Sequence, residues 1–313
     1  MVAVMGVLRR VLLRASRSPW LARQMRNRRF VRRAVTRFLP GEDAESALKA
    51  AQIFATQGIL SVLTELGENV ADRADAEAVT RDYLKVLDRI TEQRIPAQLS
   101  VKLTHLGLDL GRDICAAQLS TLVKRADALG NFVWIDMESS EYTDVTLDLF
   151  REMRRQVPNV GVCLQAYLHR TPRDLEQLMP LKPSIRLVKG AYNEPKEIAV
   201  SSKRKVSERY LDLARELLDN LSSQYHPPGF GTHDMRLVNW IRAYARGRSI
   251  AADCYEVQML YGIRSEDQRR LAADGCRVRV LISYGTAWFA WYMRRLAERP
   301  ANIWTVARSM MAP

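Results

Sequence analysis

Short apolar runs recur along the chain and are separated by amphipathic segments. Runs of about four to eight apolar residues, rich in β-branched side chains and bounded by turn residues, are typical of buried strands. Eight segments fit this pattern: residues 59–63, 98–103, 132–137, 161–166, 185–190, 229–233, 255–260 and 278–283.

The amphipathic segments flank these runs. Apolar residues three and four positions apart predict helices at residues 42–56, 74–92, 112–129, 143–156, 171–179, 203–223, 235–246 and 265–274. Strands that alternate with helices form a parallel sheet, and eight such units close into a barrel. We therefore expect an α/β fold, a (β/α)8 TIM-like barrel over residues 42–313, preceded by a basic helical arm over residues 1–41.

The arm holds most of the charge of the protein. The net charge is +13, and residues 1–41 contain eleven Arg and neither Asp nor Glu, which leaves +2 for the remainder. A basic amphipathic helix binds anionic membrane surfaces, whereas an Arg-rich N-terminus without acids is typical of a mitochondrial transit peptide. A solvated arm packed on the barrel is the third interpretation. Aromatic residues are too sparse in the arm to favour nucleic acid as a partner.

Composition narrows the class of protein further. The chain has 313 residues, of which 47% are hydrophobic, so it can bury a large core. The four cysteines lie far apart and form no metal or disulfide pattern, which favours a reducing compartment. We expect a cytoplasmic protein, with association at the inner face of the membrane as the alternative. No metal site is expected, because the four His show no ligand spacing.

The most unusual strand is residues 185–190, because it carries two cations within an apolar run. Arg186 and Lys189 lie three positions apart, so a regular strand directs them to opposite faces unless its end is kinked. A buried cation is costly unless it is paired, which indicates either a structural ion pair or, as we favour, an anionic ligand. Gly190 has no Cβ and would let a flat or phosphorylated ligand approach the backbone.

Other polar residues occupy the predicted ends of the strands. Functional groups of such barrels lie at the carboxyl ends of the strands, so a ring of polar side chains there indicates a site. The predicted ends carry Glu68, Lys102, Asp136, Met137, Glu138, Gln165, Arg186, Lys189, Thr232, His233, Glu256 and Gln258.

Residues from about 40 to 305 resemble the proline dehydrogenase family, whose members oxidise L-proline with a flavin. Seven motifs occur in the order found in that family. They are Ser100 with Lys102 and Thr104; Asp136-Met137-Glu138; Gln165-Ala166-Tyr167; Arg186 with Lys189-Gly190-Ala191-Tyr192; Thr232-His233; Glu256 with Gln258, Leu260 and Gly262; and Arg294-Arg295 with Glu298 and Asn302.

The resemblance implies a distorted (β/α)8 barrel that binds FAD at its carboxyl end. It implies hydride transfer from proline C5 to flavin N5, which yields Δ1-pyrroline-5-carboxylate, and a quinone as the electron acceptor. It makes Asp136 and Arg186 the catalytic residues, with Asp136 holding Lys102 or an Arg in place rather than acting as a base. The implied cofactor contacts are Met137, Gln165, Val188, Lys189, Gly190, Ala191, Thr232, His233 and Glu298, and the implied substrate contacts are Lys102, Leu260, Tyr192, Arg294 and Arg295.

The spacing near the end of the chain gives independent support for a carboxylate site. Trp291, Arg294, Arg295 and Glu298 fall at i, i+3, i+4 and i+7, on one helical face. Two adjacent Arg can clamp a carboxylate, although the same pattern is typical of an exposed basic helix.

Two positions depart from the family pattern. Leu281 and Trp291 stand where the family usually has pocket tyrosines, which removes one aromatic face and adds bulk at the other. Two alternatives therefore stay open: a flavin-dependent dehydrogenase of another cyclic or secondary amino acid, and a non-catalytic FAD-binding relative. A Schiff-base enzyme using Lys102 or Lys189 is disfavoured, because Asp136 and the Arg pair indicate charged, clamped groups.

Overall fold

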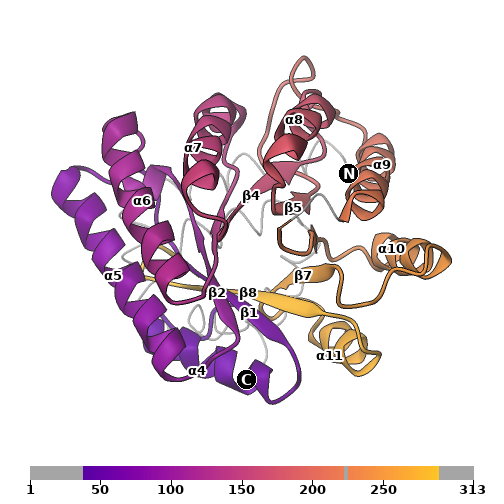
Figure 1. Ribbon diagram of the computed structural model, residues 1–313, viewed down its shortest axis with the longest axis horizontal. Coiled ribbons are helices and arrows are strands. Elements are labelled where there is room, and N and C mark those ends of the chain that lie inside the picture. Colours follow the sequence, from indigo (N-terminus) through magenta and orange to yellow (C-terminus); the bar gives the residue numbers. More distant parts are fainter. Residues whose placement is uncertain (1–37, 222–224, 289–313) are drawn as a thin grey trace, which may run out of the picture.

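The computed structural model describes residues 38–221 and 225–288, whose strands form a closed barrel. All neighbouring strands are parallel, and β8 pairs with β1 to close the ring (Figure 1). The strands are β1 (Leu60–Glu65), β2 (Ala97–Val101), β3 (Val133–Ile135), β4 (Val160–Gln165), β5 (Ile185–Val188), β6 (Gly229–Gly231), β7 (Glu256–Leu260) and β8 (Val278–Tyr284). The predicted (β/α)8 fold and all eight predicted strands are confirmed.

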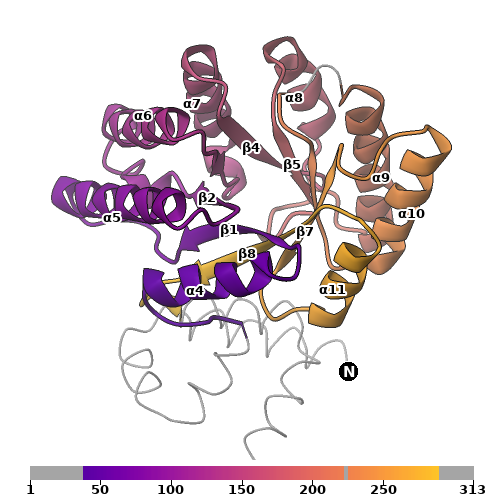
Figure 2. The same cartoon turned by 60° about the horizontal axis from the view of Figure 1, so that its bottom comes forward.

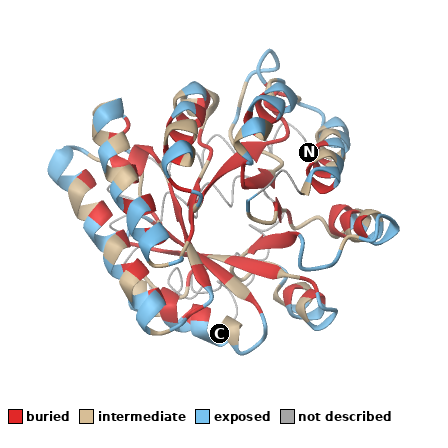
Figure 3. Ribbon diagram, in the orientation of Figure 1, coloured by how far each residue is buried: buried red, intermediate tan, exposed pale blue. Residues whose placement is uncertain are grey.

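Helices surround the barrel and leave their outer faces in solvent (Figure 3). They are α4 (Ala44–Ala55), α5 (Arg73–Glu92), α6 (Arg112–Ala128), α7 (Thr143–Gln156), α8 (Thr171–Leu178), α9 (Lys203–Asp219), α10 (Met235–Gly247) and α11 (Ser265–Ala273). Short 3-10 helices, among them η1 (Thr104–Leu106), η2 (Ser140–Tyr142) and η3 (Met179–Leu181), lie in the connections. Each predicted helix is confirmed; the one predicted at residues 203–223 ends earlier, at Asp219.

Side chains that accept hydrogen bonds from free backbone amides start several of these helices. Asp43 Oδ1 accepts from Ser46 N at 2.7 Å at the start of α4, and Asp72 Oδ1 accepts from Asp75 N at 2.9 Å at the start of α5. Such caps typically stabilise a helix by about 1 kcal/mol. The helices therefore begin at positions that the local sequence specifies.

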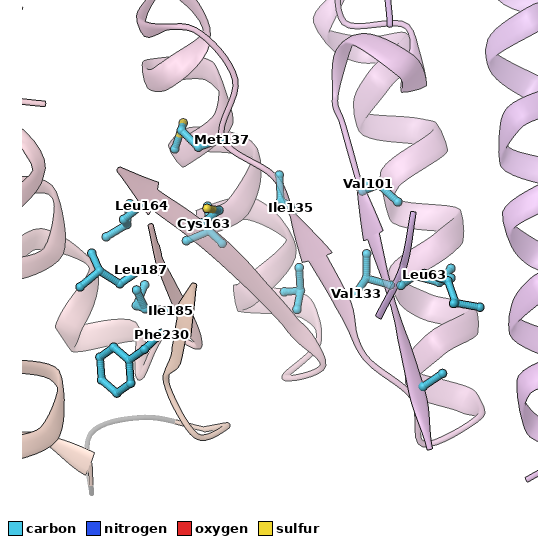
Figure 4. Close-up of a cluster of buried hydrophobic side chains, with 14 of the residues drawn as sticks. Leu63, Val101, Val133, Ile135, Met137, Cys163, Leu164, Ile185, Leu187 and Phe230 are labelled. Atoms are coloured by element: carbon cyan, nitrogen blue, oxygen red, sulfur yellow. The ribbon is translucent and has the colours of Figure 1, made fainter. Parts of the chain in front are cut away.

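The strands separate two groups of side chains. In β3, Val133 and Ile135 face the helices and join the main hydrophobic core, part of which is drawn in Figure 4. Trp134, between them, points into the barrel and packs with Val62 and Phe132. This alternation places the next residue of the same face, Asp136, toward the barrel axis at the carboxyl end of the strand.

The segment that precedes the first strand contacts the segment that follows the last strand. Helix α4 packs along β1 and β8 (Figure 2). Just before α4, the carbonyl of Glu42 accepts from Gly285 N at 3.0 Å, and Glu42 Oε1 accepts from Trp288 Nε1 at 2.7 Å. Most of the expected arm lies outside the described residues, so its helices and the boundary at residue 41 stay predictions. Of the helices that the structure describes, none is both long and apolar enough to cross a bilayer.

Candidate active site at the carboxyl ends of the strands

Arg186 reaches from β5 past β4 to side chains of β2 and of the end of β3. Its Nη1 donates to Asp136 Oδ1 at 2.9 Å and to Ser100 Oγ at 2.8 Å, and Ser100 Oγ donates to the same carboxylate at 2.8 Å. Burial lowers the pKa of Arg186, and the negative charge of Asp136 opposes that shift. Arg186 Nε and Nη2 have no hydrogen-bond partner among the described residues. Two buried donors on one cation are therefore left without a partner in the protein, which is costly unless a ligand binds them.

Lys102, which follows β2, has a different partner. Its Nζ lies 3.1 Å from Glu68 Oε1, and the two side chains are 16% and 26% exposed. The prediction left open whether Asp136 holds Lys102 or an Arg, and in the structure Asp136 holds Arg186. Lys102 and Glu68 form a separate, partly exposed ion pair at the ends of β1 and β2. This pair places an ammonium group where a carboxylate substrate could exchange with Glu68.

The loop after β3 is fixed by the strands on both sides of it. Glu138 accepts from Thr104 N at 3.0 Å and from Thr104 Oγ1 at 2.7 Å, while Gln165 Nε2 donates to the Glu138 carbonyl at 2.9 Å. Burial raises the pKa of Glu138, and the two bonds from Thr104 act against that shift. Met137 is buried in the same loop. The predicted contact Met137 therefore lies in a loop that the predicted contact Gln165, the last residue of β4, holds through its bond to Glu138.

Lys189 points away from Arg186. Its Nζ lies 3.1 Å from Ser207 Oγ in α9 and 3.2 Å from Asp234 Oδ2, the residue that caps α10. Salt bridges to Arg236 and Lys189 hold the pKa of Asp234 at about 2. The side chains of Arg186 and Lys189 thus lie on different sides of the end of β5, as the period of a regular strand predicts.

Gly190 adopts a backbone conformation that favours glycine, with φ of +112°. A Cβ at this position would lie 2.2 Å from Cδ1 of Tyr167. The close approach that the sequence suggested for a ligand is made, in the structure, by the Tyr167 ring. Val188 and Tyr192 are half-buried on either side of Gly190, and Ala191 is exposed.

Thr232 and His233 follow β6 and connect it to its neighbours. Thr232 Oγ1 accepts from Asp234 N at 3.1 Å, and His233 Nε2 accepts from Leu260 N at 2.9 Å. Because Nε2 is an acceptor, a neutral His233 carries its proton on Nδ1 and can donate from that atom. Leu260, the last residue of β7, is half-buried. The two predicted cofactor contacts and one predicted substrate contact therefore meet at adjacent strand ends.

Glu256 does not belong to the ring of strand ends, and its assignment from the sequence was wrong. It begins β7, is fully buried, and binds Arg279 through two hydrogen bonds of 2.7 and 2.8 Å. Full burial would raise the pKa of Glu256, but Arg279 and Arg277 hold it at about 2. Glu256 is part of a structural ion pair at the amino end of the barrel, far along the strand from the site.

The remaining predicted contacts, Arg294, Arg295 and Glu298, lie outside the described residues, as does Trp291. Their roles stay predictions. One residue that the sequence analysis did not select is Trp134, whose ring lies beneath Arg186. Its position two residues before Asp136 in the same strand placed it on the same face, and that spacing was the available signal.

Comparison with known proteins gives a consistent match over most of the chain. The family model described as Proline dehydrogenase matches residues 47–308. Proline dehydrogenase 1 of Bacillus subtilis (strain 168) is 36% identical over 275 residues, which are 88% of this chain and 90% of that protein. Proline dehydrogenase of Deinococcus radiodurans is 35% identical over 280 residues, 88% of this chain and 89% of that protein.

Solved structures agree on the fold. Proline utilization A (PutA) from Bdellovibrio bacteriovorus, inactivated by N-propargylglycine, superposes with a TM-score of 0.79 at 23% identity, over 85% of this chain and 32% of that chain. PutA from Corynebacterium freiburgense gives a TM-score of 0.72 at 20% identity, over 97% of this chain and 34% of that chain. The chain thus spans about a third of the length of these two proteins, and the likeness establishes the shared barrel.

Proposed function

The chain belongs to the proline dehydrogenase family, and we propose from this premise that it oxidises L-proline to Δ1-pyrroline-5-carboxylate with bound FAD. The observation that carries the proposal is Arg186, a buried cation with two unpaired donors, at the carboxyl end of a (β/α)8 barrel. When bound, the flavin would accept the hydride from C5 of proline, and a quinone would receive the electrons afterwards.

The described residues fit a flavin. An electron-rich, hydrogen-bonding ring system would satisfy Arg186 Nε and Nη2, which otherwise stay buried without partners. His233 can donate from Nδ1, because its Nε2 is used by Leu260 N. The residues that we propose to hold the cofactor are Met137, Gln165, Arg186, Val188, Lys189, Gly190, Ala191, Thr232, His233 and Glu298.

Lys102 supplies the cation for the substrate carboxylate. Its partner Glu68 orients the ammonium group while proline is absent. We assign Arg294 and Arg295 to the same carboxylate and Leu260 and Tyr192 to the apolar side of the ring. Opposite charges at hydrogen-bond distance orient the substrate carboxylate strongly, and charge-assisted bonds are about twice as strong as neutral ones.

Asp136 positions Arg186 and does not remove the substrate proton. Its Oδ1 accepts from both Arg186 Nη1 and Ser100 Oγ, so the carboxylate is committed to holding the guanidinium. A fixed cation close to the flavin stabilises negative charge where it develops. Proline bound with a neutral amine would give its C5 hydride to the flavin without a protein base acting at C5, and the nitrogen proton of the resulting iminium would leave to solvent.

A second candidate is the oxidation of another cyclic amino acid. Leu260 pairs in register with Leu281 across β7 and β8, and both side chains are partly exposed. Two adjacent leucines make an apolar wall that a larger ring could contact. The same site chemistry would then act on a homologue of proline with a six-membered ring.

The basic arm supports a membrane partner. Residues 1–41 contain eleven Arg and no acidic residue, a composition that attracts anionic lipid surfaces. Quinones dissolve in the bilayer, so binding at its surface would bring the flavin near its electron acceptor.

An anaerobic absorbance titration of the purified protein tests the proposed function. We expect a yellow protein whose flavin band is bleached by L-proline and not by D-proline, the matched control. Bleaching by pipecolate (the six-membered homologue) and not by proline would transfer the assignment to the second candidate. A protein that takes up no FAD from solution would contradict both.

A further inference from the structure

Trp134 and Arg186 form a buried stack inside the barrel. Cζ of Arg186 lies 4.7 Å from the centroid of the Trp134 ring. Both side chains are almost fully enclosed, with exposures of 0% for Trp134 and 4% for Arg186. A guanidinium on an aromatic face in a desolvated site is attracted far more strongly than the same pair in water. The indole therefore packs beneath the guanidinium, whose Nε and Nη2 have no partner among the described residues.

A chain of hydrogen bonds fixes the plane of the indole. Trp134 Nε1 donates to Gln98 Oε1 at 2.8 Å, and Gln98 Nε2 lies 3.0 Å from His226 Nε2. His226 Nδ1 lies 2.9 Å from the carbonyl of Pro227. These distances form a consistent series in which Gln98 donates to His226 and His226 donates to Pro227. The series requires a neutral His226, and burial lowers the pKa of this residue.

The backbone of β4 leaves the space that the indole occupies. A Cβ at Gly161 would lie 2.6 Å from Cζ3 of Trp134. Phe132 packs against the indole with ring centroids 4.9 Å apart, and His226 meets it edge-on at 5.7 Å. The ring thus has no room to move aside, and the plane of the guanidinium above it is fixed in turn.

We propose that Trp134 is a positioning residue of the flavin site, which holds Arg186 so that Nη1 stays on Asp136 while Nε and Nη2 face the cofactor. The inference rests on the proposed function and goes beyond it, because it assigns a role to a residue that touches neither cofactor nor substrate. Without the ring, the guanidinium can rotate and satisfy its free donors on other acceptors, so its charge moves away from the flavin.

Two properties of the bound flavin depend on the position of the Arg186 guanidinium and can be measured without substrate turnover. A nearby cation stabilises the reduced, electron-rich flavin, so displacement of Arg186 lowers the midpoint potential. It also weakens FAD binding to apoprotein, by about thirtyfold if the stack is worth what buried cation–π contacts usually contribute. We expect both changes in Trp134→Leu and only a small fraction of them in Trp134→Phe, which keeps an aromatic face.

The controls separate positioning from loss of packing. Phe150→Leu removes a buried aromatic side chain from the outer core, on α7, and should leave the potential unchanged. Gly161→Ala should shift the potential in the direction of Trp134→Leu, because the added methyl displaces the indole. Circular dichroism and thermal melts of each variant establish that the barrel is folded before the flavin is measured.

The decisive comparison is a double-mutant cycle with Arg186→Met. If Trp134 acts through Arg186, adding Trp134→Leu to Arg186→Met changes neither the potential nor the affinity further. Equal effects of Trp134→Leu with and without Arg186 overturn the inference, as does an unchanged potential in the single variant. A parent protein that takes up no FAD overturns the proposed function as well, so the two failures are distinguishable.

Discussion

The backbone N–H of Leu260 donates to Nε2 of His233 at 2.9 Å, so one strand end is held by the loop after the neighbouring strand. His233→Leu removes the acceptor and leaves a largely buried N–H unpaired. We expect the free energy of unfolding to fall by about 1–3 kcal/mol and KM for proline to rise. Urea unfolding and steady-state kinetics measure the two effects. His233→Gln offers an amide oxygen in place of Nε2 and should recover most of the lost stability.

Gln268 holds the other side of the same turn. It is fully buried in α11, and its Nε2 donates to the carbonyls of Leu260 at 3.0 Å and Ile263 at 2.8 Å. Gln268→Leu keeps the volume but removes both donors. We expect KM to rise severalfold with a smaller change in kcat, because Leu260 loses its fixed position, and stability to fall by roughly 1–3 kcal/mol. The exposed Gln57→Leu is the matched control; a larger effect on kcat than on KM would contradict this role.

Glu65, at the end of β1, makes stability depend on pH. Burial raises its pKa from 4.5 to about 7, with a smaller contribution from Asp82, and Oε2 has no hydrogen-bond partner among the residues described. When the pKa of a carboxyl is raised in the folded state, the protein loses stability as pH rises. For Glu65 the loss begins near pH 4.5 and is complete above about pH 7. Glu65→Gln should therefore stabilise the protein at pH 8, by on the order of 3 kcal/mol.

The sign of this effect is what the measurement checks. Chemical unfolding of parent and Glu65→Gln should give equal stabilities near pH 4 and a difference that grows up to about pH 7. The surface variant Glu92→Gln provides the comparison for a carboxyl at an exposed helix end. A variant less stable than the parent at pH 8 would show that Glu65 forms a favourable charged interaction instead.

The basic arm can be removed without cutting into the barrel. Leu39 is buried, and Glu42 binds Gly285 and Trp288, so a truncation should end at residue 37. The full chain should sediment with vesicles containing phosphatidylglycerol and release as salt rises, because the attraction is electrostatic. The truncated protein should remain in the supernatant and keep its flavin spectrum. Vesicles of phosphatidylcholine alone are the control, and equal sedimentation of both proteins would exclude the arm as the lipid-binding segment.

The sequence predicts features that depend on one segment better than contacts that join distant segments. The eight strands were predicted because buried parallel strands are apolar runs, a pattern that lies within each segment. The pairing of Arg186 with Asp136, and of Lys102 with Glu68, was not predictable in detail. These contacts join different strands, and their choice depends on the stagger of the closed barrel.

Gly190 shows a second limit. The sequence indicated that a ligand approaches the backbone at this position, and that stays a prediction. It could not tell that the ring of Tyr167 makes the approach, because that contact depends on the loops after β4 and β5 together. Glu256 was misplaced for a related reason: β7 carries its polar residues, Glu256 and Gln258, in its first three positions, and polarity alone does not tell which end of a strand a residue occupies.

The corrected position of Glu256 yields a prediction about the amino end of the barrel. Glu256→Gln leaves the guanidinium of Arg279, which is 2% exposed, without its charged partner. We expect a loss of about 3–5 kcal/mol at neutral pH, as for other broken buried pairs. Because the pKa of Glu256 is lowered to about 2, the stability that the ionised carboxylate contributes is present above about pH 4.5 and is lost as pH falls toward 2. The stabilities of parent and variant should therefore converge in acid.

Replacing both partners, as Glu256→Met with Arg279→Leu, removes the unpaired charge and should be far less destabilising than the single change. If the double variant is as unstable as Glu256→Gln, the pair contributes through its bonds to Gln258 and the carbonyl of Ser61 rather than through its own charge balance.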